Sequence, residues 1–171
     1  SIHFEAAMGK QVLYLNGNKV GEHQGGYLPF SLNLTDQGVV AGDTCVVAVM
    51  VDNSNDKTFP PGKPQYTLDF SYHGGIYRDV SLISVSPIHI STTHYASSGV
   101  YVNTPEITEE KALVDICTML SNTQAERSKI FVEHKIYSAT GECVATSKKK
   151  VIVNTEREQA FNIQIVVNHP E

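Results

Sequence analysis

The sequence predicts an all-β protein in which two β-sandwiches follow one another. Apolar and polar residues alternate with a period of two in most segments, as in residues 160–167, and helical periodicity is absent except in one ambiguous segment. Short turns rich in Gly, Asn and Asp separate these segments. The composition changes after Val85-Ser86-Pro87, beyond which glycines are fewer. We therefore predict one sandwich on each side of Pro87.

The chain opens with a strand and a hairpin. Residues 2–6 alternate between apolar and polar side chains, which predicts a strand. Asn16-Gly17 lies between the segments 11–15 and 19–22, and both of its residues tolerate the positive φ of a type I′ turn. The sequence therefore predicts a hairpin at this position.

Two further strands and a long loop follow in the first half. Residues 30–36 carry apolar side chains on one face, which predicts a half-buried strand. Residues 44–51 form a nearly continuous apolar run, which predicts a central strand buried on both faces. Residues 53–64 are polar and contain Pro60-Pro61-Gly62, so we expect a loop there.

The second half also predicts strands. Thr140-Gly141-Glu142 indicates a hairpin turn between the strands expected at 130–137 and 143–153. Residues 108–120 begin like a helix, with a polar cap followed by spaced apolar residues. The β-branched residues within this segment favour a strand, which we therefore predict. About seven short strands over this length are typical of an immunoglobulin-like sandwich.

Composition excludes several classes of function. The 171 residues carry a formal net charge of −5, and no basic cluster is longer than Lys148-Lys149-Lys150, so no nucleic-acid partner is expected. No run of eighteen apolar residues occurs and no signal-peptide pattern begins at Ser1, so we expect no membrane span. The sequence leaves periplasmic, secreted and cytoplasmic locations open.

Cysteine and histidine residues are scattered along the chain. The three cysteines have no Cys-x-x-Cys spacing, and we expect free thiols packed as small buried hydrophobes, although Cys117 and Cys143 could meet across two sheets. The seven histidines show no metal-ligand spacing, and we expect all of them except His73 at the surface or at caps.

One polar segment stands out because it precedes a tight turn. Gly74-Gly75 allows the backbone to take a positive φ, and Ile76, Val80 and Leu82 then predict a strand. The polar residues before the turn would therefore be presented at a strand end, where binding sites are commonly built. The alternative is that the segment serves packing alone, with Arg78-Asp79 forming a structural ion pair at a domain boundary.

Two blocks of sequence resemble one family of enzymes. Residues 74–80, Gly-Gly-Ile-Tyr-Arg-Asp-Val, are similar to the G-[IL]-x-R-x-V signature of glycoside hydrolase family 2, which includes β-galactosidases and β-glucuronidases. Residues 13–30 are similar to the N-G-x-x-V-G-x-x-x-G-G-Y-x-P-F segment of the same family. The two blocks occur in the family's order, which makes the resemblance specific.

The resemblance implies a partial jelly-roll sugar-binding domain at 1–87 and an immunoglobulin-like β-sandwich at 88–171. Family members carry their two catalytic carboxyl groups on a (β/α)₈ barrel that follows these domains, and this chain shows no such pattern, so we expect it to be inactive alone. Glu109-Glu110 and the pair Asp52 and Asp56 are expected to be turn and surface charges. We expect no cofactor in this chain, although a sodium or magnesium ion is an option in the full-length parent.

The resemblance also suggests substrate-binding residues. Asp69 aligns with an aspartate that, in many family members, extends from the sugar-binding domain into the pocket of the barrel. Tyr72 and His73 lie beside it in the same motif, and the loop 53–64 would lie near the mouth of the pocket. Alternatively, Asp69 caps its own loop. The aromatic side chains of Tyr66, Phe70, Tyr72 and Tyr77 could face a sugar ring, although core packing is the commoner role.

The expected partner is a β-galactoside or related glycan, held together with the missing catalytic barrel of the parent. Galactose is preferred over glucuronic acid because residues 74–79 resemble the galactosidase branch more closely. The family's domain has further strands ahead of this point, so we expect the first sandwich to form a homo-oligomer or to be marginally stable. Two other functions are a stand-alone carbohydrate-binding module and a structural, adhesion-type pair of sandwiches.

Overall fold

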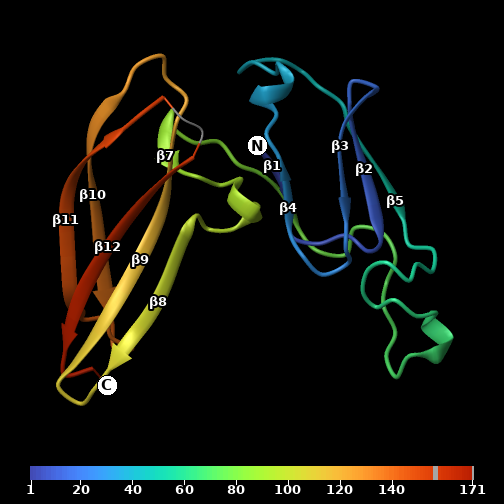
Figure 1. Cartoon of the computed structure of the whole chain (residues 1–171). Helices are drawn as coiled ribbons and strands as arrows, with labels where there is room; N and C mark the ends of the chain where they lie inside the picture. The colour runs from blue at the N-terminus through green and yellow to red at the C-terminus, as the bar shows by residue number, and fades with distance from the viewer. Residues whose placement is uncertain (156–157, 171) are drawn as a thin grey trace. The chain divides into compact units, whose positions relative to one another are not determined.

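The computed structural model describes residues 1–155 and 158–170, and this part of the chain is all-β (Figure 1). It divides into two compact units, Ser1–Ser84 and Val85–Glu171. The helical segments among the described residues are three short 3₁₀ turns: η1 (Thr35–Gln37), η2 (Gln65–Thr67) and η3 (His94–Ala96). No helix of the described residues is long and apolar enough to cross a membrane.

The first unit is a sandwich of two antiparallel sheets. One sheet has the order β4-β1-β6 and the other has the order β3-β2-β5. The strands are β1 (Ile2–Phe4), β2 (Lys10–Leu15), β3 (Asn18–Gln24), β4 (Phe30–Leu32), β5 (Val47–Asp52) and β6 (Val80–Leu82). Both sheets contribute to one hydrophobic core, in which Phe4 stacks on Phe30 with 4.6 Å between ring centroids and Leu13 packs from β2. This shared core is why the two sheets form a sandwich.

The hairpin predicted at Asn16-Gly17 is confirmed. β2 pairs with β3 on either side of the turn, and φ is 48° at Asn16 and 83° at Gly17. The Asn16 side chain also makes a contact outside the turn, because its Oδ1 accepts a hydrogen bond of 2.8 Å from the Val46 amide. The turn therefore also fixes the entry into β5.

The prediction that residues 44–51 form a central strand buried on both faces is wrong. β5 begins at Val47, and its residues alternate between half-buried and exposed. Val47 and Val49 pack against the core, whereas Ala48 and Met50 face outward. A continuous apolar run could not reveal this alternation, because the outward positions also carry apolar side chains.

The strand predicted at residues 30–36 is shorter than expected. β4 ends at Leu32 and η1 begins at Thr35. The Asn33 side chain accepts a hydrogen bond of 3.2 Å from the Thr35 amide, a local interaction that competes with strand pairing. Leu34 nevertheless remains in the core.

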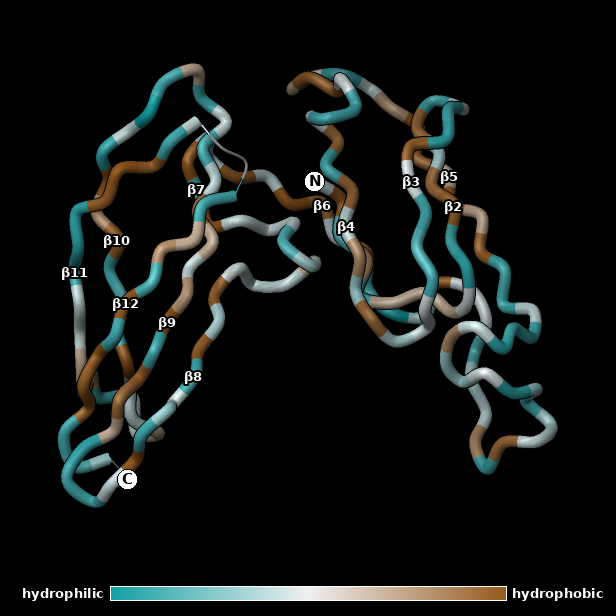
Figure 2. Tube along the Cα trace, in the orientation of Figure 1, coloured by the Kyte–Doolittle hydropathy of each residue, from teal (hydrophilic) through white to brown (hydrophobic). Residues whose placement is uncertain are grey.

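The second unit is an immunoglobulin-like sandwich. One sheet has the order β12-β9-β7, and β8 also pairs with β9, while β10 and β11 form the other sheet. The strands are β7 (Ile88–Ile90), β8 (Val100–Ile107), β9 (Lys111–Asn122), β10 (Ser128–Tyr137), β11 (Cys143–Val153) and β12 (Gln159–Asn168). The ambiguous segment 108–120 is thus a strand, as predicted. Hydrophobic and hydrophilic residues alternate along β12 (Figure 2).

The core of the second unit lies between these sheets. Leu120, Val132 and Val153 form its buried centre. Thr118 is fully buried, and its Oγ1 lies 2.9 Å from Nε2 of His134 on the facing sheet. This polar contact satisfies a buried hydroxyl that would otherwise cost stability.

The hairpin predicted around residue 141 is confirmed. The Ser138 amide donates to the Glu142 carbonyl at 2.9 Å, which closes the predicted turn between β10 and β11.

The cysteines of the described residues are free, but Cys143 is exposed and Cys45 and Cys117 are half-buried. The expectation of buried thiols is therefore wrong for Cys143.

Five of the six histidines expected at the surface or at caps are half-buried, and two of these five have a buried ring nitrogen without a hydrogen-bond partner among the described residues. His23 is half-buried and stacks on Phe30 with 4.6 Å between ring centroids. Its Nε2 is buried and has no hydrogen-bond partner among the described residues. His134 is half-buried as well. Burial lowers the pKa of both His23 and His134 below the usual value of 6.5.

Acid should therefore destabilise the first unit through His23. The unfolded state takes up its proton near pH 6.5, while the folded state takes it up only at a lower pH. The contribution of neutral His23 to the stability of the first unit is fully present above pH 6.5 and is lost as the pH falls toward the pKa of the folded state. Chemical denaturation measures the free energy of unfolding at pH 7 and at pH 5. The decrease between these pH values should be smaller for His23→Phe, which keeps a stacking ring, than for the parent chain.

The control is His169→Asn, which removes an exposed histidine from the second unit. Because this residue lies outside the first unit, the substitution should leave the pH dependence of the first unit's unfolding free energy unchanged. If the unfolding free energy fell equally between pH 7 and pH 5 in the parent chain and in His23→Phe, this role of His23 would be contradicted.

Candidate functional site

The predicted site residues lie in the long connection between β5 and β6. Its first part is held at Asp56, whose Oδ2 lies 2.5 Å from Nζ of Lys10 on β2. Its last part is held by Met8, whose amide donates to the Gly75 carbonyl at 2.9 Å, and by a bridge between Ala7 and Ile76. The connection is therefore anchored to the first unit at both ends.

Close packing at Gly74 brings the two ends of this connection together. A Cβ added at Gly74 would lie 2.3 Å from Nδ2 of Asn53, and Gly75 has a φ of 80°. A side chain at position 74 would therefore displace the Asn53 amide group, whereas the positive φ favours glycine at position 75. The chain between Asn53 and Gly74 forms a loop whose two ends touch.

The two sequence blocks that resemble the enzyme family meet in the structure. The Tyr77 hydroxyl donates a hydrogen bond to the Gly26 carbonyl, which joins residues 74–80 to residues 13–30. Gly26 in turn packs on Met8, because a Cβ at Gly26 would lie 2.4 Å from the Met8 sulfur. This contact gives a physical reason for both blocks: each holds the other in position.

Asp69, Tyr72 and His73 all lie on the anchored loop, after η2. Asp69 and His73 are exposed, and Tyr72 is half-buried. The Tyr72 carbonyl accepts a hydrogen bond of 3.5 Å from Nε2 of Gln65. Within the described residues, the Asp69 carboxylate has neither a hydrogen-bond donor nor a cationic partner. The loop therefore presents a carboxylate whose acceptor positions are available.

The aromatic residues of this loop differ in their surroundings. Tyr66 is 87% exposed and Phe70 is 54% exposed, so neither belongs to the core. Tyr77 is half-buried and is held by its bond to Gly26. The bond to Gly26 therefore gives Tyr77 a structural role, whereas core packing does not explain Tyr66 or Phe70.

The predicted ion pair between Arg78 and Asp79 does not form among the described residues. The Arg78 guanidinium lies 5.9 Å from the centroid of the Tyr77 ring, and the Asp79 backbone carbonyl accepts a hydrogen bond of 3.0 Å from the Glu5 amide. Adjacent residues on an extended segment point to opposite sides, which explains why the two charges do not meet.

Sequence reasoning missed the role of Lys10. The hydrogen bond from Lys10 holds the pKa of Asp56 well below its usual range, and hydrogen bonds from Thr58 act in the same direction. The same contact raises the pKa of Lys10. Both groups are therefore charged at neutral pH, and the loop keeps this ionic anchor. A lysine 46 positions before its partner carries no local signal.

The described residues contain no group of three His, Cys, Asp or Glu side chains that could hold a metal ion. A sodium or magnesium ion in the full-length parent stays a prediction. The loop by itself can accept and donate hydrogen bonds and offer aromatic surface.

The arrangement defines a class of protein: an all-β pair of sandwiches that presents an anchored polar loop. A family model described as glycosyl hydrolases family 2, sugar binding domain, matches residues 1–87. The chain belongs to this family.

Two curated relatives and one solved structure are similar to almost the whole length of this chain. The chain is 28% identical to a β-glucuronidase of Formosa agariphila over 99% of its own length, and 29% identical to a β-galactosidase of Thermoanaerobacterium thermosulfurigenes over 95%. A solved structure of β-glucuronidase 2 from Bacteroides uniformis, covalently bound to cyclophellitol-6-carboxylate aziridine, superposes with a TM-score of 0.86 at 33% identity over 99% of the chain. The chain spans 18%, 22% and 20% of the lengths of these three proteins.

Proposed function

We propose that this chain is the non-catalytic sugar-binding and spacer region of a β-galactosidase-like glycoside hydrolase. Residues 1–87 would form the sugar-binding domain and residues 88–171 the immunoglobulin-like domain. The described residues contain no α-helix, so the catalytic (β/α)₈ barrel would come from another part of the natural polypeptide.

The observation that carries this proposal is the anchored loop with its exposed carboxylate. Asp69 is exposed and unpartnered among the described residues, while Lys10, Met8 and Tyr77 hold the loop that bears it. A carboxylate without a partner accepts hydrogen bonds strongly, and sugar hydroxyls are good donors. A loop held at both ends positions such an acceptor without a large entropy loss on binding.

Asp69 would orient the sugar rather than break a bond. Its carboxylate would accept hydrogen bonds from ring hydroxyls and strengthen them in the transition state. His73 would add a second polar contact, and Tyr72 would supply an aromatic surface beside it. The bond cleavage itself belongs to two carboxyl groups of the barrel.

The proposed substrate is a β-galactoside, and a β-glucuronide is the specific alternative. The motif at residues 74–79 favours galactose, whereas matches to named β-glucuronidases favour the alternative. The two sugars differ at C6, which is a hydroxymethyl group in galactose and a carboxylate in glucuronic acid, and in the configuration at C4, so a parallel assay separates them.

The test is to purify the natural polypeptide that contains this chain and to assay it on 4-nitrophenyl β-galactoside and 4-nitrophenyl β-glucuronide. We expect a polypeptide several-fold heavier than 18.8 kDa that hydrolyses one of them, with the galactoside preferred. A natural polypeptide of about this mass, without hydrolytic activity, would favour a stand-alone binding module or a structural protein instead.

A further inference from the structure

A shallow depression on the second unit forms a second place where a saccharide would fit. It has a volume of about 510 Å³ and crosses three neighbouring strands, β8, β9 and β12. The volume falls within the usual range of small-molecule sites. The depression belongs to the second unit alone and shares no residue with the Asp69 loop.

Strand register shows which face of the sheet carries the depression. Tyr101, Cys117 and Asn162 lie side by side across the three strands, and Asn103, Asp115 and Gln164 form a second such row. Val102, Ile116 and Ile163 lie between these rows, so their side chains point to the opposite face. Ile116 is buried in the sandwich, which makes that opposite face the inner one.

The depression therefore opens on the outer face of the sheet. Its floor is the backbone between the two rows, and its walls are the six side chains of those rows. They are Tyr101, Asn103, Asp115, Cys117, Asn162 and Gln164. The set combines one aromatic ring, three amides, one carboxylate and one thiol.

The polar groups of this set are arranged for hydroxyl recognition. Gln164 donates from Nε2 to Oδ1 of Asp115 at 2.8 Å, which holds both side chains across β9 and β12. The part of the chain that the structure describes provides no donor to the Gln164 oxygen or to the second Asp115 oxygen, so both are left for ligand donors. Asn103 and Asn162 each offer both a donor and an acceptor, as neighbouring sugar hydroxyls require.

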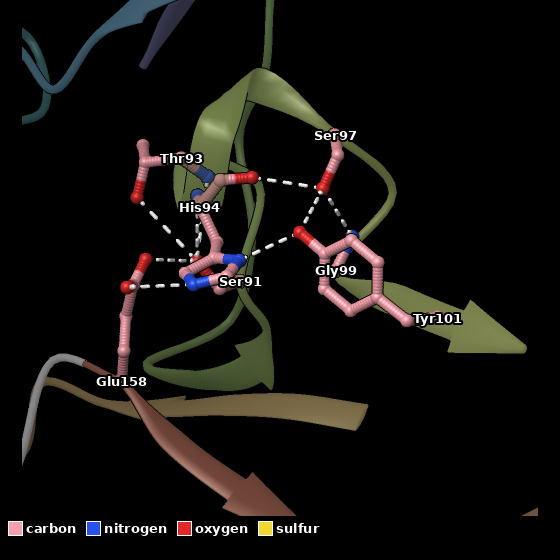
Figure 3. A network of polar contacts seen from close by, with 7 residues as sticks. All are labelled: Ser91, Thr93, His94, Ser97, Gly99, Tyr101 and Glu158. Atoms are coloured by element: carbon pink, nitrogen blue, oxygen red, sulfur yellow. Dashed lines mark hydrogen bonds and ion pairs between the residues drawn. The ribbon is translucent and has the colours of Figure 1, made fainter. Parts of the chain in front are cut away.

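A network of polar contacts holds the tyrosine at the end of the depression (Figure 3). The Tyr101 hydroxyl lies 2.6 Å from Nδ1 of His94 and 2.7 Å from Oγ of Ser97. Ser97 itself donates to the His94 carbonyl at 2.8 Å, so it accepts from Tyr101, which in turn accepts from His94. The ring, which is 37% exposed, is thereby oriented through its hydroxyl.

The network also joins this tyrosine to the start of β12, the strand on the other side of β9. Ser91 is buried, and its hydroxyl donates to Oε1 of Glu158 at 2.8 Å. The other Glu158 oxygen lies 3.8 Å from Nε2 of His94. The segment before β8 is therefore held against the start of β12, which limits the loss of entropy when a ligand stacks on Tyr101.

We propose that this outer depression binds a neutral saccharide of about disaccharide size, with Tyr101 stacking on a sugar ring and Asp115, Asn162 and Gln164 bonding to its hydroxyls. The single charge in the lining is the Asp115 carboxylate, which would repel an acidic sugar. The site would hold a polymeric substrate away from the reacting bond, and the choice of a β-galactoside as probe rests on the proposed function.

The test is a ¹⁵N nuclear magnetic resonance titration of the 171-residue chain with lactose. Lactose should shift the amides of residues 101–103, 115–117 and 162–164. Tyr101→Ala should weaken binding about 10-fold and Asn162→Ala about 3-fold to 10-fold. Asn168→Ala, on the same face of β12 but outside the depression, is the matched control and should bind as the parent chain does.

The outcomes separate this site from the Asp69 loop. Asp69→Ala should leave these shifts and the affinity unchanged, and a disaccharide ending in glucuronic acid should bind more weakly than lactose. An absence of lactose-dependent shifts in these three segments, or shifts that persist unchanged in Tyr101→Ala, would overturn the proposal. Hydrolysis by the natural polypeptide is a different readout, so either proposal stands or fails without the other.

Discussion

Replacing Asp69 by alanine in the natural polypeptide should lower kcat/KM on the preferred β-glycoside by about 10² to 10³. The carboxylate is exposed and lacks a partner among the described residues, so its removal leaves no buried charge and should not unfold the loop. The loss would come from hydrogen bonds to sugar hydroxyls that strengthen in the transition state. Steady-state kinetics with a 4-nitrophenyl glycoside measures it.

Asp79→Ala is the matched control, because it removes an exposed carboxylate from the same connection. It should change kcat/KM by less than about threefold, since among the described residues only the backbone of Asp79 makes a hydrogen bond. An Asp69→Ala enzyme with nearly parental kcat/KM would show that Asp69 is not a substrate-binding residue. Unchanged melting temperatures of both variants would exclude a folding defect.

Gly9→Ala should destabilise the first unit by about 3 to 5 kcal/mol. The position has a φ of 91°, and an added Cβ would lie 2.0 Å from the Asp52 carbonyl oxygen. That oxygen belongs to the backbone of β5 and cannot rotate away as a side chain would. Relieving the clash requires β2 and β5 to separate at the point where the Asp69 loop begins.

Gly38→Ala is the control for backbone conformation alone. Gly38 has a φ of 84°, but an added Cβ would meet nothing within 4 Å. Its cost should be about 1 kcal/mol, the strain of a left-handed alanine. Chemical denaturation followed by circular dichroism compares the two variants. If Gly9→Ala and Gly38→Ala lowered the free energy of unfolding equally, the backbone at Gly9 would not lie as close to the Asp52 carbonyl oxygen as described.

The fold was predictable where local interactions decide it. Asn16-Gly17 predicts its turn because both residues take a positive φ, as the structure has them. The strand β5 was misjudged because Ala48 and Met50 face outward although they are apolar. The position of His23 depends on stacking with Phe30, a contact that the alternation of a single strand does not reveal.

The candidate site was predictable only in part, since its geometry rests on contacts between distant residues. The motif at residues 74–80 indicated where the polar segment would be presented. The Lys10–Asp56 ion pair and the Tyr77–Gly26 hydrogen bond join segments far apart in the chain, and neither has a local signature. The depression on the second unit depends on the register of three strands, which alternation leaves open.

The most direct test is a crystal structure of the natural polypeptide with a non-hydrolysable β-galactoside in its catalytic pocket. The account predicts that an Asp69 carboxylate oxygen lies about 2.5 to 3.0 Å from a sugar hydroxyl. A bound sugar whose nearest atom is more than about 6 Å from Asp69, too far even for one bridging water, would contradict the account.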